Sequence, residues 1–382
     1  MRIAIYHNLL WTKYKGAVFS QLFQLGISEG VDISFIQIAE TDSDRTVLGG
    51  IDLSYHNYPF RLLFRGNYGD LSLRQLTAAL GKDLVAHPCD LVVLPNYDRA
   101  EYWVMLLFCI ILRRRRAVIC DATTYDRPKI AWQEIAKRLF FAMCDGVFSY
   151  GSRSKAYLLS YGVDETKIHI RCQAAALPHD YNSARVLSVY RSQKLETLNS
   201  PRYLYVGRLS AEKGLGDLLN AFNLVHARIP GAQLDLIGAG PLAGKLAERI
   251  SDLGLHKAVT LRGSMTLSEI QPQLLRSVAL VLPSHSEPWG LVVNESLSYG
   301  CPVVVSSHCG CVPELVVDGV SGYVFECGNV VALSTAMFAV ARLSEDRPAT
   351  AKSCMDIIAP YTADRAALQM LDGCLGILKV RA

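Results

Sequence analysis

Long apolar runs and paired cysteines are both missing from this chain of 382 residues. No apolar run reaches the roughly 18 residues that a membrane-spanning helix needs, so the sequence does not predict an integral membrane protein. The eleven cysteines are scattered without any Cys-x-x-Cys spacing, and Cys309 and Cys311 have one residue between them. Small buried thiols explain this distribution better than a disulfide framework or a thiolate metal site.

Charged residues are also few, at 19% of the chain, and the formal net charge is only +4. Such a small positive excess does not by itself indicate nucleic-acid binding. The first residues, MRIAIYHNLL, are typical of a short strand and lack the long apolar core and the cleavage site of a signal peptide. We therefore expect a cytoplasmic protein without a nucleic-acid partner.

Hydrophobic residues, by contrast, make up 51% of the chain, and its length exceeds what one core usually serves. Strand-like and helix-like runs alternate along the chain, which predicts a doubly wound α/β fold. Strands are expected at 2–6, 32–38, 91–95, 117–121 and 146–150. A second series begins at Tyr203, with further strands at 232–237, 259–262, 278–282 and 302–306. Helices are expected near 100–112, at 130–142 and, with Ser152 as its N-cap, at 152–161.

The alternation stops over 177–200, which is the best candidate for a linker. We therefore predict a first domain over 1–180 and a second domain over 201–360. A final helix is expected at about 361–382, with Thr362 as its cap.

Two glutamates, Glu287 and Glu295, stand eight positions apart on either side of a Pro-Trp-Gly turn. The turn follows the apolar strand expected at 278–282, and Gly290 opens the next helix. In an open α/β sheet, ligands bind beyond the carboxyl ends of strands, at the starts of the helices that follow. The pattern predicts a site for a polyhydroxylated anionic ligand. On an arbitrary helix, two glutamates at this spacing are more often solvated surface charges.

The residues around this pair resemble a known family. The stretch Glu287-Pro-Trp-Gly-Leu-Val-Val-Asn-Glu295 is followed by Tyr299-Gly-Cys-Pro-Val-Val and by Pro313-Glu-Leu-Val-Val-Asp-Gly-Val-Ser-Gly322. In spacing, flanking residues and order it resembles the E-x7-E block of retaining glycosyltransferase family four. The resemblance covers about 203–341 and is only architectural before that.

The resemblance implies the GT-B fold, an α/β fold with two Rossmann-like doubly wound domains facing a central cleft. The first domain would bind the acceptor and the second the nucleotide sugar, with the helix at 361–382 packing back onto the first. The implied function is a retaining, metal-independent transfer of a hexose, without a cofactor, from a nucleotide sugar to an acceptor in cell-surface polysaccharide or glycolipid assembly. UDP is favoured because it is frequent in the family. Two alternatives are a GT-B nucleotide-sugar epimerase and a catalytically idle binding subunit.

A pair of cations is expected to take the place of a metal. Gly207-Arg208-Leu209 and Glu212-Lys213-Gly214 follow a strand and open a helix, so a guanidinium, an ammonium and a helix N-terminus converge. Such groups can neutralise the charge that develops on a departing diphosphate. The resemblance implies this role for Arg208 and Lys213, and a partial match at Lys15-Gly16-Ala17 adds Gly16. The alternative is a surface Arg and Lys near a helix start.

The resemblance also implies roles for the block around the two glutamates. Glu295 would accept hydrogen bonds from the ribose hydroxyls, and Glu287 would contact the donor sugar and stabilise an oxocarbenium-like transition state. The backbone amides of Trp289, Gly290, Leu291 and Val292 would add donors at the helix start. A covalent nucleophile is the second role considered for Glu287, because retaining hydrolases use two carboxylates in that way.

Four further residues have weaker assignments. Gly238 and Gly240 would lie beside the nucleotide, but a tight turn before Pro241 also explains them. Arg262 resembles a position near the base, although a charged strand terminus is the commoner meaning. Asp121 would lie against the donor sugar or cap a helix, and we weigh these two interpretations equally.

A membrane contact is also considered. The ten apolar residues at 103–112 are too few to span a bilayer and predict a buried or an interfacial helix. Basic residues nearby could form a surface that attracts anionic lipid, which would place the protein at the inner face of the membrane. They are Arg113, Arg114, Arg115, Arg116, Arg61 and Arg65.

Overall fold

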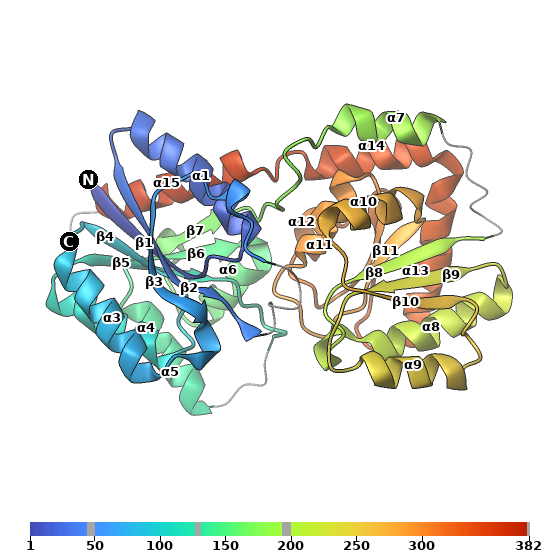
Figure 1. Ribbon diagram of the computed structural model, residues 1–382, viewed down its shortest axis with the longest axis horizontal. Helices are drawn as coiled ribbons and strands as arrows, with labels where there is room; N and C mark the ends of the chain where they lie inside the picture. Colours follow the sequence, from blue (N-terminus) through green and yellow to red (C-terminus); the bar gives the residue numbers. More distant parts are fainter. Residues whose placement is uncertain (44–49, 127–130, 193–199, 380–382) are drawn as a thin grey trace. The chain divides into compact units, whose positions relative to one another are not determined.

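The computed structural model describes residues 1–43, 50–126, 131–192 and 200–379. It consists of two compact units, one formed by Met1–Ala176 with Tyr361–Ala382 and the other by Leu177–Pro360. Each unit has a parallel sheet with helices on both faces (Figure 1).

The first unit has a seven-stranded sheet in the order β3-β2-β1-β4-β5-β6-β7. Its strands are β1 Arg2–Leu9, β2 Asp32–Thr41, β3 Phe60–Asn67, β4 Leu91–Leu94, β5 Arg115–Cys120, β6 Gly146–Tyr150 and β7 Ile168–Arg171. Its α-helices are α1 Lys13–Ser28, α3 Leu73–Ala86, α4 Ala100–Ile111, α5 Ala131–Ala142, α6 Gly151–Ser160 and α15 Ala363–Lys379. Short 3₁₀ turns cover Leu53–Tyr55, Tyr68–Asp70 and Glu165–Lys167.

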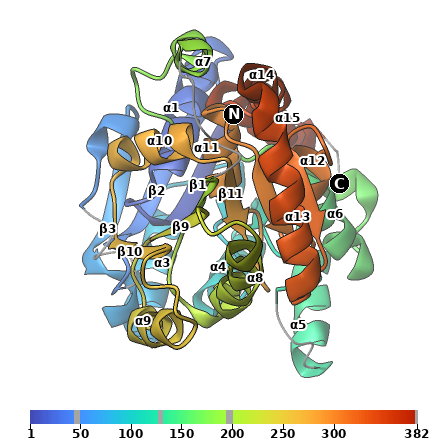
Figure 2. The same ribbon diagram turned by 90° about the vertical axis from the view of Figure 1, so that its right-hand side faces the viewer.

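The second unit has a six-stranded sheet in the order β10-β9-β8-β11-β12-β13. Its strands are β8 Arg202–Val206, β9 Gln233–Ile237, β10 Val259–Gly263, β11 Ala279–Leu282, β12 Val303–Ser306 and β13 Gly322–Phe325. Its α-helices are α7 Ser183–Ser192, α8 Leu215–Arg228, α9 Ala243–Asp252, α10 Leu267–Arg276, α11 Leu291–Ser298, α12 Val312–Leu315, α13 Val330–Leu343 and α14 Arg347–Ile358. Figure 2 shows α8, α9 and α13 on one side of this sheet and α10, α11 and α14 on the other.

Both sheets reverse their strand order once, between β1 and β4 in the first unit and between β8 and β11 in the second. Every residue of β4, β11 and β12 is buried, as expected for strands covered by helices on both faces. In open α/β sheets, ligands bind beyond the carboxyl ends of the strands at such a reversal. In the second unit, that place is formed by the loops after β8 and β11.

The strands that the sequence did not predict are β3, β7 and β13, and each lies at the edge of its sheet. Their residues are only partly buried, with intermediate positions throughout most of β3 and in the centre of β13. An edge strand is covered less completely than a central one, so its sequence lacks a continuous apolar run. The central strands, in contrast, lie close to their predicted positions.

Two predicted boundaries change in the structure, and a third falls outside the described residues. The segment 177–200 is not simply a linker, because α7 forms in it and buries Val186 and Tyr190, which are four residues apart on one helix face. Helix α6 begins at Gly151 with Tyr150 at the capping position, so Ser152 lies inside its first turn and is not the N-cap. Ile130, at the start of the predicted helix 130–142, lies outside the described residues.

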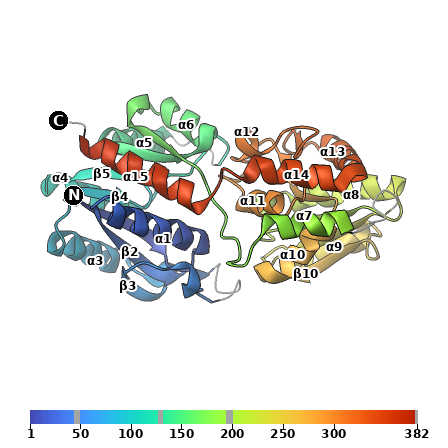
Figure 3. The same ribbon diagram turned by 90° about the horizontal axis from the view of Figure 1, so that it is seen from above.

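Helix α15 packs against α1 and the strands β6 and β7 of the first unit (Figure 3). Thr362 caps it as predicted, since its hydroxyl accepts a hydrogen bond from the Arg365 N–H at 3.2 Å. Gly373 allows the close approach, because a Cβ there would lie 2.5 Å from the Phe148 ring. The end of the predicted segment, 380–382, lies outside the described residues.

Candidate functional site

The loop after β8 packs directly on the loop after β11. Gly214 begins α8 with a φ of 64°, and a Cβ at this position would lie 2.1 Å from the Pro283 carbonyl oxygen. The Glu212 carbonyl accepts a hydrogen bond from the His285 N–H at 2.8 Å. Only glycine fits such a contact with this backbone conformation, so the sequence Glu-Lys-Gly brings the two loops together.

An ion pair joins these loops at the reversal of strand order. Lys213 Nζ lies 2.7 Å from Glu287 Oε2, and their side chains are only 12% and 16% exposed. The two residues are 74 positions apart in the sequence. Glu287 is held further by its backbone, because its carbonyl accepts a hydrogen bond from the Gly310 N–H at 2.9 Å. A carboxylate and an ammonium thus share a sheltered place where a ligand of this fold class is expected.

Arg208 lies in the same loop and reaches solvent. Its guanidinium forms an ion pair with Glu212 at 3.1 Å, and its side chain is 48% exposed. Glu212 also accepts a hydrogen bond from the Ser210 hydroxyl at 2.6 Å. Burial raises the pKa of Glu212, but the Ser210 hydrogen bond and the neighbouring cations outweigh burial and lower it overall. Glu212 therefore stays ionised and orients Arg208, a role that sequence reasoning did not assign to it.

Sequence reasoning also missed a histidine beside this loop. His285 Nε2 lies 2.7 Å from Asp217 Oδ2 in the first turn of α8. The His285 carbonyl oxygen accepts a hydrogen bond from His308 Nδ1 at 2.9 Å. The only signal in the sequence was the position of His285 just after a buried strand.

Glu295 lies in α11, which begins after Gly290 with its φ of 97°. Among the described residues, no side chain or backbone group forms a hydrogen bond or ion pair with the Glu295 carboxyl. Part of the residue reaches the surface, yet desolvation raises its pKa to about 7. A carboxyl that lacks a partner and is costly to ionise is suited to accept hydrogen bonds from a ligand.

Two features of the residues before Glu295 matter here: the buried side chain of Trp289 and the backbone N–H groups at the start of α11. Trp289 is buried, and its indole N–H donates to Asn294 Oδ1 at 2.8 Å, so its ring supports the loop. Leu291 and Val292 stand in the first turn of α11, where backbone N–H groups have no partner within the helix. The role of these amides as donors to a ligand stays a prediction.

Gly238 and Gly240 follow β9 and touch the loop after β8. A Cβ at Gly238 would lie 1.8 Å from the Gly207 carbonyl oxygen, and one at Gly240 would lie 2.5 Å from that of Leu209. Close packing of the two loops therefore explains both glycines, and their place beside the nucleotide stays a prediction. They support the backbone that carries Arg208.

Arg262 contacts a buried carboxylate of its own unit. Its Nε donates to Asp235 Oδ1 at 2.8 Å, and Arg202 binds Asp235 Oδ2 at the same distance. Arg276 adds a third cation at 3.7 Å. This contact matches the interpretation of Arg262 as a charged strand terminus.

In the first unit, Gly16 lies where the backbone of α1 packs closely against the His56 side chain. A Cβ there would lie 2.8 Å from the ring of His56. Asp121 follows β5 and is exposed, and no helix begins beside it in the described segment up to 126, so the helix-cap interpretation has no support. The prediction that Asp121 contacts the donor sugar remains a hypothesis.

Beside Asp121 the first unit contains two buried cations that sequence reasoning missed. Lys15 and Arg171 are 4% and 1% exposed, and both donate to the hydroxyl of Tyr150. Burial, followed by the repulsion of Arg171, lowers the pKa of Lys15 well below its usual value, whereas Asp121 raises it. No local pattern could have revealed this cluster, because Lys15 and Tyr150 are 135 positions apart.

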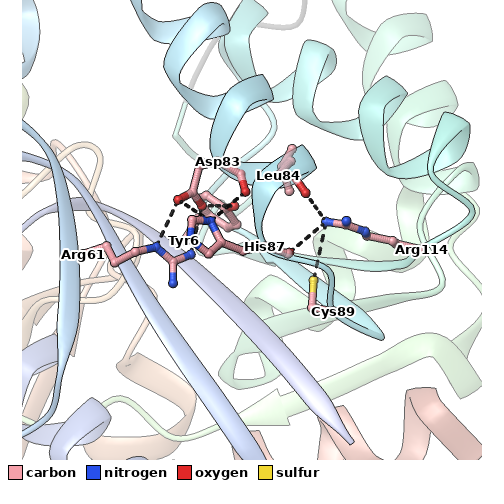
Figure 4. Close-up of polar contacts among 7 residues, drawn as sticks. All are labelled: Tyr6, Arg61, Asp83, Leu84, His87, Cys89 and Arg114. Atoms are coloured by element: carbon pink, nitrogen blue, oxygen red, sulfur yellow. Dashed lines mark hydrogen bonds and ion pairs between the residues drawn. The ribbon is translucent and has the colours of Figure 1, made fainter.

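The basic surface predicted from six arginines does not form. Arg61 binds Asp83 through two hydrogen bonds of 3.0 Å, and Arg114 is buried and donates to the Leu84 and His87 carbonyls (Figure 4). Arg115 donates to the Ile377 carbonyl at 2.8 Å and Arg116 to that of Met143 at 2.6 Å. Arg65 and Arg113 remain exposed. Four of the six arginines therefore stabilise the first unit, and the prediction of one surface was wrong.

No helix in the described part of the chain is long and apolar enough to cross a membrane. Over the same residues, no group of three His, Cys, Asp or Glu side chains could hold a metal ion. The sequence contains one Asp-x-Asp spacing, at Asp42 and Asp44, a pattern that can mark a metal site. It follows β2 in the first unit, and Asp44 lies outside the described residues.

Residues 189–354 match the family described as Glycosyl transferases group 1. This segment is a group 1 glycosyltransferase domain. It contains Arg208, Lys213, Glu287 and Glu295, and thus both loops at the reversal of strand order.

Curated relatives match over the group 1 domain. The poly(glycerol-phosphate) alpha-glucosyltransferase of Bacillus subtilis is 35% identical over 147 residues, which are 37% of this chain and 22% of the relative. The glycogen synthase of Mycobacterium tuberculosis is 34% identical over 149 residues, 39% of this chain and 35% of the relative. The chain therefore matches about a fifth and a third of the lengths of these two relatives.

Solved structures match over nearly the whole chain. HepE from Anabaena, in complex with UDP, has a TM-score of 0.73 at 19% identity and covers 98% of this chain and 99% of its own. At this identity the likeness shows the fold alone. It confirms the predicted fold class of two Rossmann-like α/β units, which is the architecture of GT-B glycosyltransferases.

Proposed function

We propose that this protein is a retaining glycosyltransferase that moves a hexose from a UDP-linked sugar to an acceptor in polysaccharide or glycolipid assembly. The observation that carries the proposal is the Lys213–Glu287 ion pair at the reversal of strand order in the group 1 domain. A diphosphate beside Lys213 would place the attached sugar beside Glu287. The pair therefore occupies the junction between the leaving group and the transferred group.

In the proposed reaction, the bond between the sugar C1 and the phosphate oxygen breaks, and a bond between C1 and the acceptor oxygen forms on the same face. The acceptor hydroxyl gives its proton to the departing phosphate. Arg208 and Lys213 neutralise the negative charge on the diphosphate, which removes the need for a metal. Glu287 stabilises the positive charge that develops on the sugar ring.

The Lys213 contact bears on the second role considered for Glu287. A covalent nucleophile needs a carboxylate whose electrons are available to the sugar carbon. The ammonium at 2.7 Å withdraws that electron density, which favours electrostatic stabilisation over covalent attack. During transfer, negative charge develops on the departing phosphate. The Lys213 ammonium, which pairs with Glu287 in the structure, would then pair with the phosphate.

We infer that the second unit, at 201–360, binds the nucleotide sugar, with Glu295 accepting hydrogen bonds from the ribose hydroxyls. The amides of Leu291 and Val292 would donate to the sugar or the phosphate. The first unit, at 1–180 with the last helix, would bind the acceptor. Asp121 would contact the donor sugar from there. UDP is favoured because Anabaena HepE, which has the same fold, was solved in complex with UDP.

The ribose assignment predicts a pH dependence. The ionised Glu295 carboxyl accepts hydrogen bonds from hydroxyls, and its pKa is raised to about 7. UDP should therefore bind more weakly below pH 7, where Glu295 is protonated, and more tightly as the pH rises from 6 to 8. Isothermal titration calorimetry checks this against Glu295→Gln, because the titration of UDP itself is common to both proteins. Equal pH profiles for the two would contradict the assignment.

Thermal unfolding with UDP, GDP and ADP tests the donor site. A nucleotide at about 100 times its dissociation constant should stabilise the fold by about 2.7 kcal/mol and raise the midpoint by a few degrees. We expect UDP to do so for the parent and for Arg191→Ala, which removes an exposed arginine of α7, but not for Arg208→Ala. No shift with any nucleotide would contradict the diphosphate site and favour an idle subunit. Donor turnover without an acceptor would favour an epimerase.

A further inference from the structure

Three arginines of the second unit surround one buried carboxylate. Arg202 Nη1 lies 2.8 Å from Asp235 Oδ2, and Arg262 Nε lies 2.8 Å from Asp235 Oδ1. Arg276 Nη2 lies 3.7 Å from the same Oδ2 atom that Arg202 contacts. The Asp235 side chain is 2% exposed, whereas those of the arginines are 29% to 40% exposed. We refer to Arg202, Arg262 and Arg276 as the arginine cluster.

The register of the sheet explains why two of these arginines meet Asp235. Leu204 of β8 lies opposite Asp235 of β9, and Thr260 of β10 lies opposite Asp235 on the other side. Side chains in register project from the same face of a sheet, and every second residue of a strand shares that face. Arg202 stands two residues before Leu204 and Arg262 two residues after Thr260, so both project from the face that carries Asp235.

The third arginine comes from the end of helix α10, which packs against β8. The Val278 N–H donates to the Arg202 carbonyl at 2.8 Å, so the chain just after Arg276 lies beside the first residue of β8. Lys213 and Glu287, in contrast, follow the carboxyl ends of β8 and β11. Arg202 and Arg276 therefore lie at the opposite edge of the sheet from the candidate donor site.

The positive charge of the cluster exceeds what Asp235 balances. Both Asp235 oxygens already accept hydrogen bonds from Arg202 and Arg262, so Asp235 does not need Arg276. Among the residues that the structure describes, the buried Nε of Arg276 has no hydrogen-bond partner. Burial lowers the pKa of Arg276, and repulsion by Arg202 lowers it by more than the attraction of Asp235 raises it. Three arginines and one aspartate leave an excess of two positive charges.

We propose that the arginine cluster binds a phosphate group. A guanidinium presents paired N–H donors that match two oxygens of one phosphate, and arginine clusters recognise phosphate by such charged hydrogen bonds. A phosphate monoester carries a charge of about −1.5 to −2 near pH 7, which matches the excess of the cluster. The group belongs to a small phosphorylated metabolite or to a phosphate-containing polymer. The alternative is a purely structural cluster whose arginines are screened by water and salt.

Calorimetric titration of the full chain with inorganic phosphate tests the proposal, at an ionic strength held constant with sodium chloride. We expect the parent to bind phosphate at least ten times more tightly than Arg276→Gln. Arg276→Lys should fall between the two, because lysine keeps the charge but not the paired donors. Arg249→Gln is the matched control and should bind like the parent. Arg249 is an exposed arginine of α9 that donates to Asn220 Oδ1 at 2.8 Å.

Arg208→Ala separates this site from the proposed donor site, which also attracts phosphate. Arg208→Ala should keep the phosphate binding that Arg276→Gln loses, and Arg276→Gln should keep the thermal shift with UDP. Equal phosphate affinities of the parent and Arg276→Gln would overturn the proposal. Loss of phosphate binding in Arg208→Ala alone would also overturn it and assign phosphate to the donor site. Phosphate binding at the cluster requires no UDP, so the proposal and the proposed function can fail separately.

Linear polyphosphate distinguishes the two sources of the phosphate group. Binding of inorganic phosphate that Arg276→Gln loses would indicate a small metabolite. Binding of polyphosphate alone, again lost in Arg276→Gln, would indicate a polymer. Absence of binding by either probe to the parent would overturn the proposal. Circular dichroism during urea unfolding verifies that Arg276→Gln is folded under the conditions of the titration.

Discussion

Replacing Glu287 with Gln should slow sugar transfer by about 10²- to 10³-fold and leave nucleotide binding almost unchanged. The amide cannot stabilise the positive charge on the sugar ring as a carboxylate does. Its oxygen can still accept a hydrogen bond from Lys213, which now lies 2.7 Å from Glu287, so the loops should keep their places. Initial rates of transfer, measured beside calorimetric titration with UDP, separate the two effects.

Glu248→Gln is the matched control, because Glu248 is an exposed glutamate on α9 of the same unit. It should change neither rate nor binding. Loss of nucleotide binding in Glu287→Gln would contradict the assignment of this residue to the sugar. Mass spectrometry of the parent after mixing with donor gives a second criterion, since a covalent sugar adduct at Glu287 would establish the nucleophile role instead.

Gly214→Ala should destabilise the second unit by at least about 2 kcal/mol, whereas Gly216→Ala should stabilise it by up to about 1 kcal/mol. At Gly214 the backbone has a φ of 64° and a Cβ would lie 2.1 Å from the Pro283 carbonyl oxygen. At Gly216, two residues further along α8, a Cβ would meet no atom within 4 Å. Urea unfolding, followed by circular dichroism, measures both changes.

The two substitutions add the same methyl group, so each variant controls for the chemistry of the other. Gly214→Ala should also weaken UDP binding, because Lys213 precedes the distorted position. Similar stabilities for the two variants would show that the loops after β8 and β11 separate without cost. That result would remove the geometric basis for the Lys213–Glu287 contact.

The central strands, and the loops that carry the candidate site of the second unit, were predictable because their signals are local. Fully buried strands such as β11 appear as apolar runs, and the loop motifs follow these strands directly. Parallel strands end at one edge of a sheet, so Lys213 and Glu287 could be assigned to one site although they are 74 positions apart. Their direct contact could not be predicted, because it depends on how the two loops pack.

What the sequence did not reveal depends on long-range packing. The edge strands β3, β7 and β13 lack the continuous apolar pattern of covered strands. The arginine run suggested a basic surface, yet Arg115 and Arg116 belong to β5, and Arg114 is enclosed by the end of α3 and its following turn. The shared contact of Lys15 and Arg171 with Tyr150 joins three distant segments.

Gly214, Gly238 and Gly240 let three loops of the second unit contact one another closely through their backbones. Such backbone contacts do not depend on a ligand, so the proposed diphosphate site is formed as the unit folds. The loops thus lose their conformational entropy when the unit folds and not when a nucleotide binds. A nucleotide then meets a preorganised surface, and more of its contact energy remains to hold the sugar in the geometry for transfer.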